Sequence, residues 1–151
     1  MTSKYQLPKD GGLIKESAPK DIVHRYERMP ARVFDSEYNG VMYVADIICS
    51  LVRNHSDKGI NEELPPFVLG LTTGRTPLGL YRELVRRHKE GEISFKNVAV
   101  YSLDEFYPIR STEQQSRNYR IHDEFLKHID IEPENVHIPD GTIPAKDVSE
   151  Y

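Results

Sequence analysis

Two short segments of the chain bring together residue types that could do chemistry. The loop Thr72–Thr76, reading TTGRT, joins the apolar run Phe67–Leu71 to Pro77. A strand, a small-residue loop and a helix N-terminus together offer several backbone N–H groups to one point, where a phosphate is the usual ligand. The second segment is Asp104-Glu105, which follows another apolar run at residues 97–103. A carboxylate there could move a proton on a bound carbon skeleton, as in enediol chemistry.

Each segment also has a purely structural interpretation. The loop is neither a P-loop nor a G-x-G-x-x-G motif, and Gly74 could be present only for its φ angle in a strand-to-helix turn. Asp104 could cap a helix or stabilise a loop. Glu105 is favoured as a structural or solvent-facing residue over a secondary catalytic one. The six histidines form no H-x-x-x-H or H-x-x-E-H pair, so no metal site is predicted.

Short apolar strands that alternate with amphipathic helices must position these segments. The elements predicted in chain order are a strand at 31–35, a helix at about 37–54, a strand at 67–71, a helix at about 77–89, strands at 97–103 and 136–138, and between these two a helix at about 116–128. Thr76 is expected to cap the second helix, and Gly91 to end it. The alternation predicts an α/β fold, a mainly parallel sheet with helices on both faces.

Ligands of an open parallel sheet bind beyond the carboxyl ends of its strands. Both chemical segments follow predicted strands, so they meet at one edge if those strands are neighbours. The loop would then hold the phosphate of a sugar phosphate while Asp104 acts on its carbon atoms.

Length and charge exclude several classes of partner. The 151 residues suit one domain at 31–151, preceded by an irregular polar arm at 1–30 that is expected to wrap the surface. The net charge of −4 argues against general nucleic-acid binding, and Arg86-Arg87 with Lys89 is predicted to be a solvated helix end. No apolar run approaches the roughly 20 residues that span a bilayer. No membrane partner is therefore expected.

The compartment is predicted from the N-terminus and the cysteine content. The opening residues, MTSKYQLPKDGG, contain no apolar signal segment, so secretion is not expected. The single cysteine, Cys49, excludes an internal disulfide and fits a reducing cytoplasm. It lies on the apolar face of the first predicted helix and is expected to serve packing.

Three segments carry a resemblance to a known family. LGLTTGRTPLGLYREL, ISFKNVAVYSLDEFY and HDEFLKHIDIEPENVHIPDG resemble the glucosamine-6-phosphate deaminases (isomerases), well over residues 67–151 and more loosely over 31–54. The T-G-x-[ST]-P loop is shared with the 6-phosphogluconolactonases. The L-D-E-[FY] strand end favours the deaminases, because lactonases have a D-E-R type sequence there. The resemblance implies a Rossmann-like fold of the deaminase and CoA-transferase-like group, and conversion of glucosamine 6-phosphate and water to fructose 6-phosphate and ammonia.

The resemblance also implies roles for single residues. Thr73, Gly74, Arg75 and Thr76 would surround the substrate phosphate, mostly through backbone N–H groups, and Asp104 would move the proton from C2 to C1 of the opened sugar. No cofactor or metal is implied, and homo-oligomers are. Arg75 replaces the usual Gly or Ser, and could contact the phosphate or point to solvent. Arg117 stands where many members have Tyr after Ser, so a substrate contact made by that tyrosine is not expected here.

The family's D-G-H-I-A-F-N-E-P type motif, which supplies a ring-opening histidine, has no match here. We therefore expect the chain to be the front part of a longer, truncated α/β domain and to be inactive or nearly so when taken alone. Two alternatives stay open: a 6-phosphogluconolactonase-like hydrolase, and a sugar-phosphate-sensing module that binds without turnover. An amino sugar and a lactone offered as substrates would separate the two enzymes.

Overall fold

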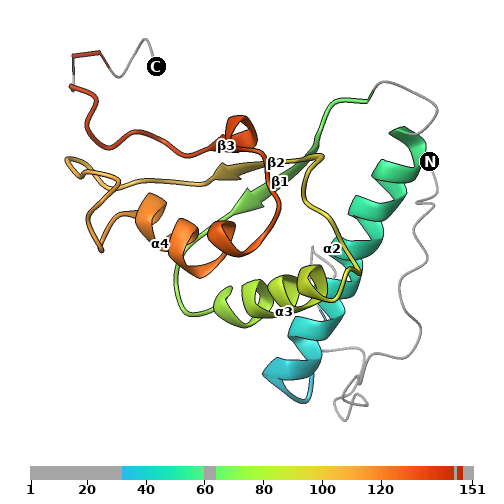
Figure 1. Cartoon of the computed structure of the whole chain (residues 1–151). Helices are drawn as coiled ribbons and strands as arrows, with labels where there is room; N and C mark the ends of the chain where they lie inside the picture. The colour runs from blue at the N-terminus through green and yellow to red at the C-terminus, as the bar shows by residue number, and fades with distance from the viewer. Residues whose placement is uncertain (1–31, 60–63, 145, 148–151) are drawn as a thin grey trace, which may run out of the picture.

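The computed structural model describes residues 32–59, 64–144 and 146–147 (Figure 1). The polar arm expected at 1–30 lies outside the described residues, as does most of the helix start expected at 144–151. The helices and strands alternate as predicted. In chain order they are α2 (Glu37–Gly59), β1 (Phe67–Leu71), α3 (Leu78–Lys89), β2 (Val98–Ser102), α4 (Arg117–Glu124) and β3 (Val136–His137), with short 3-10 turns at Leu126–His128 and Pro133–Asn135.

The three strands form one parallel sheet in the order β1-β2-β3. Strand β1 pairs with β2 from Phe67↔Val98 to Leu71↔Ser102, so both strands end at the same level. The α/β class with a parallel sheet is therefore confirmed. The strand predicted at 31–35 is wrong for its described part, because residues 32–35 contain only an isolated bridge at Phe34. Its aromatic ring packs on Tyr43 of α2, with ring centroids 5.2 Å apart, so this segment covers a helix instead of joining the sheet.

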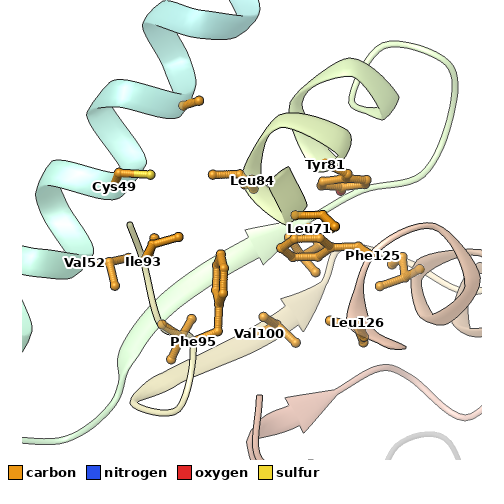
Figure 2. Close-up of a cluster of buried hydrophobic side chains, with 14 residues drawn as sticks. Cys49, Val52, Leu71, Tyr81, Leu84, Ile93, Phe95, Val100, Phe125 and Leu126 are labelled. Atoms are coloured by element: carbon orange, nitrogen blue, oxygen red, sulfur yellow. The ribbon is translucent and has the colours of Figure 1, made fainter. Parts of the chain in front are cut away.

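One face of the sheet carries the hydrophobic core (Figure 2). Leu71 and Val100 point into it from the strands, and α3 and α4 add Tyr81 and Phe125, whose rings stack with centroids 5.0 Å apart. Alternate residues along a strand face opposite sides of the sheet. On the other side of the sheet the larger side chains remain open to solvent among the described residues, with Val68 63% and Tyr101 47% exposed, whereas the small Ala99 between them is buried.

The prediction of helices on both faces is therefore not met by the part of the chain that the structure describes. Its three helices contribute to a single core cluster on one face, and Cys49 of α2 lies fully buried within it, which confirms the packing role predicted for that cysteine. None of these three helices is long and apolar enough to cross a membrane, as far as the described residues extend.

Three helix ends differ from the predictions. Helix α4 stops at Glu124 instead of about residue 128, and a separate 3-10 turn follows at Leu126–His128. Helix α2 continues to Gly59, beyond the predicted end at Asn54, and His55 within it bonds through Nε2 to the carbonyl of Pro65, 2.7 Å away. Helix α3 begins at Leu78 with Pro77 as its N-cap and has no side-chain cap, so the capping role predicted for Thr76 is wrong. Pro77 already has helical φ and ψ, which places Thr76 one residue too early to cap. The end at Gly91 is confirmed by its φ of +77°.

Candidate active site

The carboxyl ends of β1 and β2 place the two chemical segments at one edge of the sheet. Leu71 and Ser102 form the last pair of the ladder, and the N–H of Leu103 donates to the carbonyl of Leu71 at 3.0 Å. The 72–76 loop and Asp104 leave the sheet directly after these residues. Strands β1 and β2 are therefore neighbours, which is the condition on which the predicted site depends.

The loop at residues 73–76 offers backbone donors. Gly74 has a φ of +121°, a conformation that side chains rarely adopt, so a glycine is required there. Within the described residues, no group accepts a hydrogen bond from the N–H groups of residues 73–76. The loop is held from α3 by the Tyr81 hydroxyl, which accepts from the N–H of Thr72 at 3.2 Å and donates to its carbonyl at 2.5 Å. These anchored, unused donors suit an anion.

Arg75 lies beside a groove whose lining residues do not include Asp104. Its side chain is exposed and lines, together with Thr76, a groove of about 720 Å³ between the loop and α2. The apolar wall of the groove comes from Val41, Val44 and Leu80. The Arg75 side chain is therefore open to solvent, and its backbone N–H is one of the loop donors that have no acceptor among the described residues.

Asp104 presents a half-exposed carboxylate at the same edge. Half of its side chain (50%) is open to solvent, and its Oδ2 lies 3.4 Å from Nη2 of Arg117. Its backbone carbonyl accepts a hydrogen bond from the Ser102 hydroxyl at 3.1 Å. A carboxylate that is held at the backbone and open to solvent can act as a base toward a ligand that binds beside it.

Arg117 is the site residue that sequence reasoning missed. As the first residue of α4 it donates from Nη1 to the Thr73 hydroxyl, and its Cζ lies 4.3 Å from the centroid of the Phe106 ring. One guanidinium thus joins the loop after β1 to the acid after β2. The available signal was its position, because a cation directly after the helix-capping Ser116 is opposed by the helix dipole.

The carboxylate of Glu105 binds the start of α4. Its carboxylate accepts hydrogen bonds from the N–H groups of Phe106, Arg117 and Asn118 at 2.8, 2.8 and 3.0 Å, and from the Ser116 hydroxyl at 2.7 Å. Because it accepts all of these hydrogen bonds, Glu105 has a structural role at the start of α4. A secondary catalytic role, the other possibility raised by the sequence, receives no support from this geometry.

The same hydrogen bonds control the ionisation of Glu105. Burial raises the pKa of its carboxyl, but the hydrogen bonds from Asn118, Arg117, Ser116 and Phe106 outweigh burial, and the net pKa is lowered. A carboxyl with a lowered pKa in the folded state stabilises the fold above its unfolded pKa of about 4.3. That stabilisation is lost as the pH falls through the folded pKa.

Glu105→Gln is expected to lower the free energy of unfolding at pH 7 by about 1–3 kcal/mol, because an amide nitrogen would face N–H donors. Urea unfolding at pH 7 and at steps down to pH 3.5 measures this. The difference from the wild type should shrink below about pH 4.3, because the unfolded chain binds a proton at Glu105 there before the folded state does. Glu134→Gln, at an exposed position, is the control. A difference that stays constant across this range would contradict the assigned role.

The structure is thus a parallel α/β sheet with a loop of unused N–H donors and an acid at its carboxyl edge, an arrangement typical of α/β proteins that bind a ligand at this edge. A family model described as glucosamine-6-phosphate isomerases/6-phosphogluconolactonase matches residues 42–151. The chain belongs to this family, which confirms the resemblance found in the three sequence segments.

The relatives narrow the similarity to one branch. The chain is 48% identical over 105 residues to a glucosamine-6-phosphate deaminase of Treponema denticola, covering 70% of this chain and 37% of the relative. It is 51% identical over 108 residues to one of Aedes aegypti, covering 69% of this chain and 39% of the relative. A solved structure of a monomeric glucosamine-6-phosphate deaminase superposes with a TM-score of 0.64 at 31% identity, covering 75% of this chain and 43% of that one. The chain thus spans well under half the length of each of these relatives.

Proposed function

We propose that the protein containing this chain is a glucosamine-6-phosphate deaminase, which converts glucosamine 6-phosphate and water to fructose 6-phosphate and ammonia. The observation that carries the proposal is the meeting of the 73–76 loop and Asp104 at one sheet edge, joined by Arg117. The identity of 48% and 51% to proteins named as such deaminases supports the choice of substrate.

In this proposal the chain's own residues bind the sugar and move one proton. The free N–H groups of Thr73, Gly74, Arg75 and Thr76 hold the phosphate. Asp104 takes the proton from C2 of the opened sugar and returns it to C1, and a proton of the amine passes to O1, so that the amino aldehyde becomes an imine at C2 with a hydroxyl on C1. Water adds to that imine, and ammonia leaves. The substrate's own carbonyl accepts the electrons, so neither cofactor nor metal is part of the proposal.

The test is to measure ammonia release from glucosamine 6-phosphate by the full-length protein, with 6-phosphogluconolactone hydrolysis measured in parallel. We expect ammonia and fructose 6-phosphate in equal amounts and no lactone hydrolysis above the uncatalysed rate. Lactone hydrolysis without ammonia release would replace the proposal by a lactonase. Binding of the sugar phosphate without either turnover would favour a sensing module.

We also propose a small-molecule substrate as the principal partner, a cytoplasmic location and a homo-oligomeric state. The buried free thiol of Cys49 supports a reducing compartment, and burial raises its pKa, partly offset by Arg87. The homo-oligomer rests on the family resemblance alone. One solved relative is described as monomeric, so light scattering on the full-length protein decides this point.

A further inference from the structure

The guanidinium of Arg117 occupies the space between the two parts of the candidate site. Nη1 donates to the hydroxyl of Thr73, and Nη2 lies 3.4 Å from Oδ2 of Asp104. Its Cζ lies over the Phe106 ring, 4.3 Å from the ring centroid. Three elements, the loop after β1, the end of β2 and the start of α4, therefore meet at one cation. Its side chain keeps 23% of its surface open to solvent.

A structural role does not account for an arginine at this position. The first residue of a helix is where the dipole opposes a positive charge. α4 has no acidic residue in its own first turn, and the carboxylate of Glu105 at its N-terminus already accepts hydrogen bonds from Ser116, Arg117 and Asn118. Glu105 holds the start of α4 through the backbone N–H of residue 117, which any residue except proline would provide. The ion pair with Asp104 contributes little to stability, because that carboxylate is half exposed.

A bound anion would explain why an arginine stands at position 117. The loop provides N–H groups without acceptors in the described part of the chain, and these carry only partial positive charge. A guanidinium adds a full charge and planar donors that match the oxygens of a phosphate. The contacts with Phe106 and Thr73 hold the guanidinium in position before a ligand arrives, which reduces the ordering that the ligand would have to impose.

We propose that Arg117 is a substrate-binding residue that supplies the side-chain cation for the phosphoryl group of a sugar phosphate held at the 73–76 loop. The sugar part of this proposal rests on the proposed function, whereas the anion part does not. Because the same guanidinium faces Asp104, a phosphoryl group that draws it toward the loop leaves that carboxylate free for proton transfer.

The test compares Arg117→Gln and Arg117→Lys with the wild type in the full-length protein, by calorimetric titration with glucosamine 6-phosphate, inorganic phosphate and glucosamine. We expect Arg117→Gln to weaken both phosphate-bearing ligands about tenfold or more, and Arg117→Lys to weaken them less, because charge is kept but the planar fork is lost. Binding of glucosamine should not change. Arg82→Gln removes one charge from the exposed side of α3 and should stay within twofold.

Thermal unfolding separates binding from folding. Arg117→Gln removes a cation from a helix N-terminus, so its melting temperature should equal or exceed that of the wild type. Unchanged phosphate affinity in Arg117→Gln, or a wild type that binds neither phosphate-bearing ligand, would overturn the inference. If the wild type binds inorganic phosphate but not glucosamine 6-phosphate, and Arg117→Gln loses the phosphate binding, the inference stands and the proposed function is rejected.

Discussion

Asp104→Asn is expected to reduce the rate of ammonia release by at least about 100-fold, while glucosamine 6-phosphate still binds with an affinity equal to or above that of the wild type. The rate falls because an amide cannot accept the C2 proton, and a positioned base contributes about 100- to 10,000-fold. Binding persists because the loop at 73–76 is intact and Arg117, 3.4 Å from the lost carboxylate, gains freedom to contact the phosphate. Steady-state kinetics and calorimetric titration of the full-length protein measure the two quantities.

The control for this substitution is Asp57→Asn, which removes the same charge from an exposed position of α2. It should leave both rate and affinity unchanged. An Asp104→Asn variant with the wild-type rate would identify Asp104 as a bystander acid and remove the enzyme proposals that depend on it. Loss of binding together with the rate would indicate instead that the carboxylate holds the site together.

The neighbouring acids Asp104 and Glu105 have different partners: Asp104 faces the guanidinium of Arg117, and Glu105 binds the start of α4. Glu105 receives four hydrogen bonds, three from backbone N–H groups and one from the Ser116 hydroxyl, and so ties the loop after β2 to α4. This attachment sets the position of Arg117, and through it the surroundings of Asp104. Glu105 thus helps to define the surroundings of Asp104, the acid for which we propose the proton transfer.

The local parts of this arrangement could be predicted from the sequence. The runs Phe67–Leu71 and Val98–Ser102 are apolar enough to be buried strands, and they are strands in the structure. Their parallel pairing followed from the helix between them. The same rule places the 73–76 loop and Asp104 at one edge of the sheet, so the location of the candidate site can be predicted from the sequence.

Contacts between distant residues could not be predicted. Arg117 and Thr73 are 44 positions apart, and no local pattern joins them. Thr76 was expected to cap α3 because threonine is a common cap, but Pro77 took that position. Arg87 was grouped with Arg86 as a solvated helix end, whereas only 4% of Arg87 is exposed. Its partners lie partly on another helix, which periodicity within α3 does not reveal.

Arg87→Ala is expected to lower the free energy of unfolding by about 2–4 kcal/mol, a large share of the 5–15 kcal/mol typical of a domain. Nη1 of Arg87 lies 2.7 Å from Asp46 of α2, and its Nε lies 2.6 Å from Glu83 of its own helix. Truncation removes the bridge between α2 and α3 and the packing of the side-chain stem. The loss stays below that of a fully isolated buried charge, because Arg86 continues to pair with Glu83 and Asp46 is half exposed. Urea unfolding at pH 7 measures the change.

Arg86→Ala provides a matched control one position away on the same helix. Arg86 is half exposed, and its pairs with Glu83 and Glu90 lie at the surface, where ion pairs contribute little. The labelling rate of Cys49 by a thiol reagent gives a second measurement, because this fully buried side chain hydrogen-bonds to Arg87 and reacts only when α2 and α3 separate. Labelling should accelerate in Arg87→Ala and stay unchanged in Arg86→Ala. Equal effects of the two substitutions would show that the buried bridge adds nothing to the contact between α2 and α3.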